Sequence, residues 1–232
     1  MQSLWNLLRG SEIVELNHLY QEYMPVWPTH PKFVLAANES YEGGDGNYNC
    51  QLIMGDHCGT HVDSPSHFIQ QGKTIDQVDV RQLMGRGILI DISHFPPGEA
   101  VGREAIDLWE KQNGPVKADD IVIFRTGWHE KWARRPNQAD FLSEWPGISA
   151  ETADYLIAKG VHVFGTDALS LDAWRSEGNP AHQAVLGNDN LIIENLANLH
   201  QLPAVFTFIA LPLRIEQGSA SPVRAIALVD KH

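Results

Sequence analysis

The chain has 232 residues, of which 43% are hydrophobic and 20% are charged, a composition that predicts a folded globular protein rather than a disordered one. Its 17 basic and 29 acidic residues give a net charge of −12, which argues against nucleic-acid binding because such a field repels phosphates. No apolar run approaches the roughly 20 residues of a membrane helix. The two cysteines are too few for a disulfide framework, and the N-terminal segment has no signal-peptide features, so we expect a cytoplasmic protein.

Short, β-branched apolar runs predict seven strands. They span residues 12–16, 50–54, 87–92, 121–126, 161–165, 205–211 and 223–229. Residues 102–112 and 149–160 have helical patterns, and in the second of these Ser149 is the expected N-cap and Gly160 the expected stop. Because strands and helices do not alternate strictly, the sequence predicts an α/β fold with a mixed β-sheet, in a single domain of residues 1–232.

The most informative segment is HCGTHVDSPSHF, residues 57–68. Its metal-ligand and acid–base side chains all occupy odd positions: His57, His61, Asp63 and His67. An extended backbone would direct these four side chains to one face. Gly59 and Pro65 both disfavour a helix, so we expect the extended arrangement.

Two imidazoles and a carboxylate within seven residues, from His57, His61 and Asp63, form a ligand set that suits zinc or manganese. Such a set leaves coordination positions open for water, and the metal then generates hydroxide at neutral pH. The alternative is that these are scattered polar residues of a loop. Their common parity favours the metal site.

The same segment resembles the HxGTHxDxPxHF signature of the putative cyclase family of metal-dependent hydrolases, which contains bacterial kynurenine formamidases and isatin hydrolases. The resemblance continues in order along nearly the whole chain. It includes PVWP (25–28), GTDALSLD (165–172), His182, Glu194 within IIENL, and ALPLRIEQGSASPVRA (210–225). It implies the swivelling β/β/α fold of this family and the hydrolysis of a small molecule.

By this resemblance, His57, His61 and Asp63 bind one divalent ion, zinc or manganese, and Asp63 bridges to a second ion that His182 and Glu194 also hold. The residue types agree with that assignment, because a second histidine and a further carboxylate are the ligands that complete a two-metal site. The expected content is one or two ions per chain.

Five further residues and a group of histidines have weaker assignments. The resemblance implies that His67 is the proton shuttle, a role that suits the ordinary pKa of histidine. Trp27 and Phe68 are candidates for an apolar substrate pocket, and Asp167 and Asp172 lie in a segment expected near the site, without an assigned role. The remaining histidines have no ligand partner at a recognisable spacing and are expected to be structural or superficial: His18, His30, His94, His129, His162 and His200.

The reaction implied by these residues is hydrolysis of a C–N amide bond by metal-activated water, without a covalent intermediate. An N-formyl arylamine such as N-formylkynurenine suits the His182/Glu194 pattern. Against it, the central segment of residues 95–145 is longer than in compact formamidases, and extra loops often reshape a substrate pocket. An isatin-type cyclic amide or lactone hydrolase with one manganese ion is the alternative. A third interpretation, a non-catalytic metal-binding homologue, is disfavoured because such a protein has no need for His67.

The partner expected for this chain is a small-molecule substrate, with neither nucleic acid nor membrane involved. The apolar segment LWNLL, residues 4–8, is compatible with a homodimer or homotetramer, as in relatives of the family. Docking of this segment on its own domain is the alternative.

Overall fold

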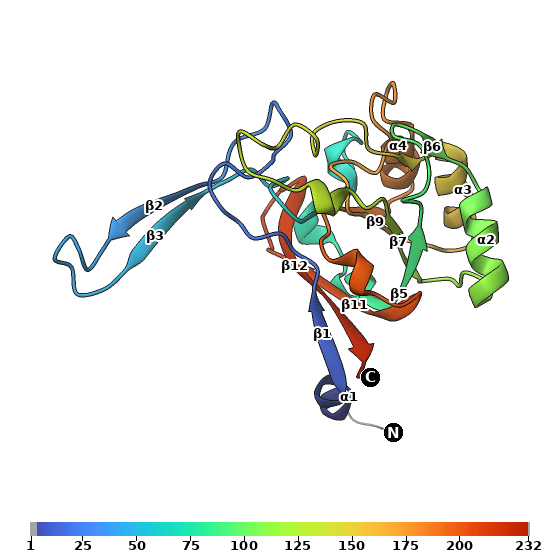
Figure 1. Cartoon of the computed structure of the whole chain (residues 1–232), viewed down its shortest axis with the longest axis horizontal. Coiled ribbons are helices and arrows are strands. Elements are labelled where there is room, and N and C mark those ends of the chain that lie inside the picture. Colours follow the sequence, from blue (N-terminus) through green and yellow to red (C-terminus); the bar gives the residue numbers. More distant parts are fainter. Residues whose placement is uncertain (1–3, 232) are drawn as a thin grey trace.

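Figure 1 shows the computed structural model of the chain, which describes residues 4–231, with the side chains of Leu4 and Leu7 left out. Its largest element is an eight-stranded sheet in the order β1-β12-β11-β5-β7-β9-β10-β4. The strands are β1 (Ser11–Glu15), β4 (His61–Asp63), β5 (Met84–Asp91), β7 (Ile121–Arg125), β9 (Val163–Thr166), β10 (Leu191–Glu194), β11 (Val205–Pro212) and β12 (Ala220–Asp230). β4 also pairs with β12, so the sheet closes on itself like a barrel.

The sheet is mixed. The pairings among β5, β7, β9 and β10 are parallel, and the other pairings are antiparallel. Parallel neighbours need crossover connections, and helices supply several of them. The helices beside this part of the sheet are α2 (Glu104–Asn113), α3 (Ala150–Ala158) and α4 (Pro180–Gly187), visible together at the right of the view (Figure 1).

The two faces of the parallel strands are both buried. On β7, Val122 and Phe124 pack into the core that contains the helices, whereas Ile121 and Ile123 pack into the core enclosed by the curved sheet. Successive side chains of a strand point to opposite faces, so a strand buried on both sides is a continuous apolar run. This explains why residues 121–124 read Ile-Val-Ile-Phe.

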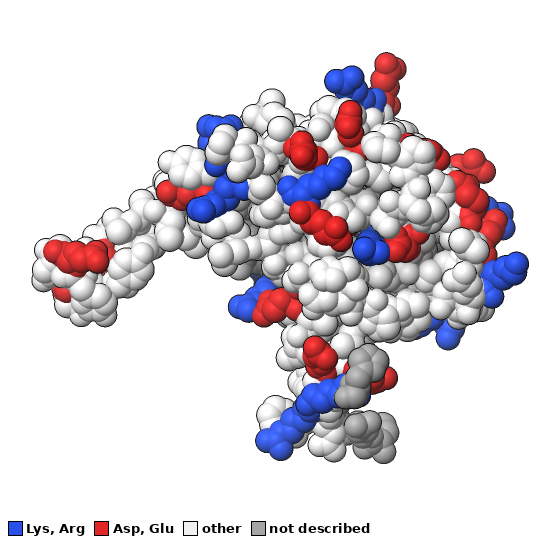
Figure 2. Space-filling view, viewed as in Figure 1, with Lys and Arg blue, Asp and Glu red and all other residues white. Residues whose placement is uncertain are grey.

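A two-stranded hairpin projects from the body of the molecule (Figure 1). It consists of β2 (Val34–Glu39) and β3 (Asn49–Ile53), and we call residues 34–53 the arm. Figure 2 shows acidic side chains at its tip and an uncharged shaft behind them. The large exposed apolar side chains of the shaft are Val34, Leu35, Leu52 and Ile53.

The remaining elements are short. They are α1 (Leu4–Gly10), β6 (Ala100–Val101), β8 (Gly147–Ile148), and the 3-10 turns η1 (Pro65–His67), η2 (Ile75–Gln77), η3 (Val80–Leu83), η4 (Trp128–Lys131) and η5 (Leu199–Gln201). β6 and β8 form a small parallel pair of their own. Among residues 4–231, no helix is both long enough and apolar enough to cross a membrane.

The seven predicted strands and two predicted helices are confirmed, with ends that differ by a few residues, and so is the mixed α/β sheet. Ser149 caps α3 as expected, its hydroxyl oxygen accepting from the Thr152 N–H at 3.1 Å. The expectation of one extended segment over residues 57–67 is wrong. Only His61–Asp63 is a strand, because His57 lies in the preceding turn and η1 begins at Pro65.

Candidate metal centre

The turn before β4 brings His57 over the strand. Gly59 within this turn has a φ of +63°, and a Cβ at this position would lie only 2.8 Å from the Tyr20 ring. The Tyr20 hydroxyl lies 2.8 Å from the Cys58 carbonyl and 2.9 Å from the Thr60 carbonyl. Glycine is therefore required both for the left-handed backbone and for the close approach to Tyr20. This turn, rather than the continuous extended strand expected from the sequence, places His57 beside the side chains of β4.

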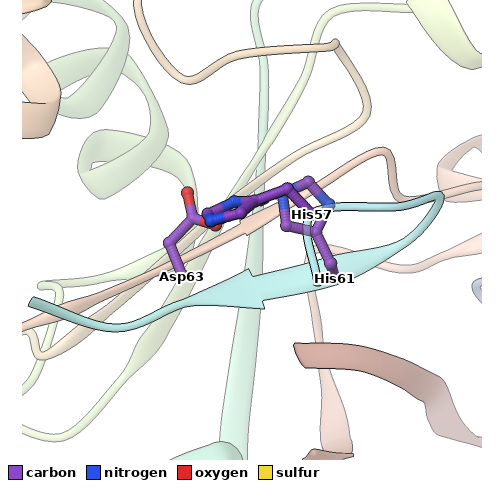
Figure 3. Close-up of side chains that lie close together, drawn as sticks. All are labelled: His57, His61 and Asp63. Atoms are coloured by element: carbon purple, nitrogen blue, oxygen red, sulfur yellow. Dashed lines mark ion pairs between the residues drawn. The ribbon is translucent and has the colours of Figure 1, made fainter. Parts of the chain in front are cut away.

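A first group of metal-ligand side chains gathers at the end of this turn. Figure 3 shows His57, His61 and Asp63 lying together, the last two on β4. His57 Nδ1 is 2.7 Å and His61 Nε2 is 3.2 Å from Asp63 Oδ1. Asp63 is fully buried, and neither of its oxygens accepts a hydrogen bond from the described residues. Burial of a carboxylate without such donors is costly unless a cation balances it.

A second group shares Asp63 with the first. Because β10 pairs with β4, Glu194 lies opposite His61, and the first turn of α4 brings His182 to the same place. His182 Nε2 is 3.2 Å from Glu194 Oε1 and 3.7 Å from Asp63 Oδ2. Asp63 thus directs one oxygen toward each group. This is the geometry that a carboxylate bridging two ions requires.

Each of the three histidines directs one ring nitrogen toward the carboxylates. In each ring, the nitrogen that faces away has a hydrogen-bond partner. These partners are Ser219 Oγ for His57 (3.0 Å), the Gly59 carbonyl for His61 (2.8 Å) and Asp172 Oδ2 for His182 (2.6 Å). Ser219 itself donates to Asp56 at 2.8 Å, so it accepts from His57. When the outer nitrogen donates and the ring is neutral, the inner nitrogen carries the lone pair that a metal ligand needs.

Electrostatics at the centre favour a cation. Burial by itself raises the pKa of Asp63, but the facing imidazoles of His57 and His61 outweigh it and lower that pKa well below its usual range. Burial by itself lowers the pKa of His61, yet Asp63 and Glu194 together raise it to about 9. Burial by itself lowers the pKa of His182, but its interactions with Asp172, Asp63 and Glu194 together raise that pKa well above its usual value. The residues present therefore fit one or two divalent cations, which satisfy the same carboxylates.

His67 stands beside the two groups rather than within them. It ends η1, and its ring centroid is 3.9 Å from that of His57 and 6.2 Å from that of His182. Burial lowers the pKa of His67 to about 4, so the imidazole is neutral at neutral pH. A neutral imidazole at this place can accept a proton.

The centre opens into a cavity of about 250 Å³. Both aromatic residues proposed from the sequence, Trp27 and Phe68, line it. The Trp27 ring packs edge-on against buried Trp145 with centroids 6.3 Å apart, and the Phe68 ring centroid is 4.9 Å from that of His182. The cavity therefore has an apolar wall beside the carboxylates and imidazoles, an arrangement typical of small-molecule sites.

Sequence analysis missed His30 and Asp56 as contributors to this site, and it expected Asp172 near the site without assigning it a role. His30 lines the cavity, 5.6 Å from His57 between ring centroids, although no spacing linked the two. Asp172 accepts from His182 Nδ1 and from the backbone N–H groups of Ala181 and His182, so it fixes both the ring and the start of α4. The only sequence signal for Asp172 was its position in the GTDALSLD segment, which the family resemblance places near the site. No sequence signal indicated Asp56, which accepts a hydrogen bond from the Ser219 hydroxyl and so orients the partner of His57.

Comparison with known proteins decides the family. The family profile described as "Putative cyclase" matches residues 14–173 of this chain, more than half of its length. The chain belongs to the putative cyclase family. The matched residues include the His57, His61 and Asp63 group, whereas His182 and Glu194 lie beyond them.

Curated relatives of this putative cyclase family member extend the match along the chain. It is 34% identical over 200 residues to the isatin hydrolase of Roseibium aggregatum, covering 78% of this chain and 74% of that protein. It is 32% identical over 224 residues to the kynurenine formamidase of Sphingopyxis alaskensis, covering 93% of this chain and 97% of that protein. Both relatives are named as hydrolases of small molecules, and this family member is a hydrolase.

Solved structures agree with the fold. An isatin hydrolase bound to the product analogue thioisatinate superposes with a TM-score of 0.88 at 29% identity, covering 97% of this chain and 95% of that one. Isatin hydrolase A from Ralstonia solanacearum gives a TM-score of 0.87 at 28% identity, covering 97% of this chain and 95% of that one. The expected cyclase-family fold is confirmed by these superpositions.

Proposed function

We propose that the protein is a metal-dependent amidohydrolase that cleaves the C–N bond of a small aryl amide, with N-formylkynurenine as the representative substrate. The observation that carries this proposal is the shared carboxylate of Asp63, one oxygen facing the His57 and His61 nitrogens and the other facing His182. Kynurenine formamidases that match over 93% or more of this chain support the choice of substrate class.

In this proposal the metal ligands are His57, His61, Asp63, His182 and Glu194, and they hold one or two ions of zinc or manganese. When bound, such an ion polarises the substrate carbonyl and lowers the pKa of a water molecule. The protein contributes the fixed directions of the ligand nitrogens through hydrogen bonds to their outer nitrogens.

His67 moves the proton. Water adds to the amide carbonyl carbon, the C–N bond breaks, and the products are an amine and a carboxylic acid, which releases its proton to solvent at neutral pH. The neutral imidazole of His67 takes the proton that water loses and returns it to the departing nitrogen, which is otherwise a very poor leaving group. Its ring lies against His57 and on the cavity lining, within reach of a substrate held there.

Trp27 and Phe68 bind the aryl part of the substrate. Both line the cavity, and both are held by other rings, Trp27 by Trp145 and Phe68 by His67 and His182. A planar ring between such side chains excludes water from the amide and leaves it facing the carboxylates.

A second candidate, hydrolysis of an isatin-type cyclic amide or a lactone with one manganese ion, has specific support. The 34% identical relative is an isatin hydrolase, and a structure at a TM-score of 0.88 has an isatin product analogue bound. Neither observation outweighs the full-length formamidase matches. A non-catalytic metal-binding protein is the third candidate, and the position of His67 on the cavity argues against it.

A panel of substrates separates these candidates. Hydrolysis of N-formylkynurenine, isatin and a simple lactone is measured with and without added Zn²⁺ or Mn²⁺. The proposal predicts the largest kcat/KM for N-formylkynurenine. A larger value for isatin or the lactone would favour the second candidate, and no turnover of any substrate by metal-loaded protein would favour the third.

We further propose that the chain acts in the cytoplasm as a homodimer or homotetramer. The net charge of −12 supports the absence of a nucleic-acid partner, and basic and acidic side chains are interspersed on the visible face (Figure 2). Trp5 of the LWNLL segment is 59% exposed, so it is available to a second copy.

A further inference from the structure

Three loops outside the catalytic cavity bring a second set of metal-ligand side chains together. η4 follows β7 and carries His129, Asp167 follows β9, and η5 comes after β10 and carries His200. Because β7, β9 and β10 are parallel neighbours, their carboxyl ends meet at one edge of the sheet. Residues far apart in the sequence are thereby placed side by side.

Asp167 fixes His129 from behind. It is fully buried, its Oδ1 accepts from the Thr126 N–H at 2.6 Å, and its Oδ2 accepts from the Gly127 N–H at 2.9 Å. The same Oδ2 accepts from His129 Nδ1 at 2.6 Å. The proton of this ring is therefore on Nδ1, which leaves Nε2 with a lone pair. Asp172 holds His182 in the catalytic centre in the same way and at the same 2.6 Å.

The Nε2 atom of His129 lies beside a second imidazole. His129 Nε2 lies 3.1 Å from His200 Nδ1, and the two rings are almost parallel, at 3°. With Zn–N bonds of about 2.0–2.1 Å, two nitrogens at the tetrahedral angle lie ~3.3 Å apart. The observed separation is thus compatible with both nitrogens binding one ion.

Glu130 supplies a third ligand of the appropriate type. The carboxylate of Glu130 and the imidazoles of His129 and His200 each offer one ligand atom, and these three atoms all lie within 4.8 Å of one another. His129 is 8% exposed, whereas His200 and Glu130 are exposed, so an ion there would be open to solvent on one side. Glu130 also lies 3.7 Å from Arg125, a weak contact that metal binding would replace.

We propose that His129, His200 and Glu130 form a separate site for a borderline divalent transition metal of the zinc class, with Asp167 as the residue that positions His129. Two imidazoles and one carboxylate form a set that these cations prefer, and a fourth position remains for water. An ion bound by these three residues would link η4 to η5. None of the three ligands lines the catalytic cavity, so the site is independent of the proposed amidohydrolase activity.

The competing explanation is a hydrogen bond alone, in which His200 Nδ1–H donates to His129 Nε2. The two explanations differ in the zinc content of the folded protein. Wild type, His200→Ala and His162→Ala are each dialysed against a zinc buffer, and zinc per chain is measured by elemental analysis. His162 is the control because it is a partly exposed histidine outside these ligands, hydrogen-bonded to Asn190.

We expect His200→Ala to hold one ion fewer per chain than the wild type, and His162→Ala to hold the same number. Glu130→Gln should bind the extra ion at least tenfold more weakly. Hydrolysis of N-formylkynurenine by His200→Ala should stay at the wild-type level, so a failure of the proposed function would leave this test unaffected. Equal zinc in His200→Ala and wild type would show that the pair is only a hydrogen bond.

Discussion

Asp63 and His67 lie within the same motif, yet the structure gives them different surroundings. Asp63 is fully buried without hydrogen-bond donors, between nitrogens of three histidines. His67 is partly buried and belongs to neither ligand group. Loss of Asp63 should therefore act through metal content, and loss of His67 should act through proton transfer. Substitutions at the two positions are therefore expected to reduce activity for different reasons.

Asp63→Ala should lower metal content, activity and thermal stability together, because ions that bind only the folded state stabilise it by about 2.7 kcal/mol at a concentration of 100 Kd. Elemental analysis and thermal unfolding, each with and without chelator, measure this. The difference in Tm between variant and wild type should shrink in chelator. Glu12→Ala, which removes an exposed carboxylate on β1, is the control and should change neither the metal content nor the Tm. Full metal content in Asp63→Ala would contradict the bridging role.

His67→Ala should keep its metal and lose turnover by roughly 10²- to 10⁴-fold, the usual range for a general acid–base group. The loss should be smaller for activated esters, whose leaving group needs no proton. Steady-state kinetics on both substrates and elemental analysis provide the measurement, with His94→Ala, an exposed histidine, as the control. Metal-free His67→Ala protein would mean that His67 is a ligand.

At the residue scale, the sequence predicted which side chains would gather but not what holds them. His57, His61 and Asp63 are close in the chain, so their spacing was informative even though the assumed continuous strand was wrong. The pair His129 and His200 is 71 residues apart, and only the order of parallel strands brings it together. No local pattern encodes such a contact.

At the scale of elements, α3 offers a local test because its N-cap was predicted from sequence and is present. Ser149→Ala removes the acceptor for the Thr152 N–H and should lower the free energy of unfolding by about 0.5–2 kcal/mol. Urea denaturation measures this, and Ser149→Asp is the control, since Asp caps as well as Ser. A stability of Ser149→Ala equal to that of the wild type would show that packing alone sets the start of α3.

Elements with strong local patterns were predictable, and those made by tertiary contacts were not. β7 is a continuous apolar run because both of its faces are buried. β4 has only three residues and exists because β10 and β12 pair with it on either side. α4 begins after Asn179 in a left-handed conformation without a side-chain cap, and Asp172 satisfies its first N–H groups instead. The local signal at this helix start is therefore Pro180 at the first helical position, whereas the cap comes from outside the helix.

At the scale of the whole molecule, the arm suggests how copies associate. Its shaft exposes large apolar side chains, including Leu35 at 43% and Leu52 at 58%, with no core of its own. An isolated two-stranded hairpin is marginally stable in water, and exposed apolar patches commonly mark interfaces. We therefore expect the arm to pack against a second chain.

Light scattering should give a multiple of the 25.9 kDa chain mass for the wild type. Leu52→Glu places a charge on the shaft and should shift the protein toward the monomer. Leu108→Glu, which charges another exposed leucine on α2, should keep the wild-type mass. A wild-type mass near 25.9 kDa would exclude self-association under the conditions used.

The most direct test of the whole account is the rate of N-formylkynurenine hydrolysis before chelation, after chelation, and after Zn²⁺ or Mn²⁺ is restored. The two ligand groups that share Asp63 predict that chelator abolishes hydrolysis and that one of these ions restores it. Hydrolysis that continues unchanged in metal-free protein would contradict the account.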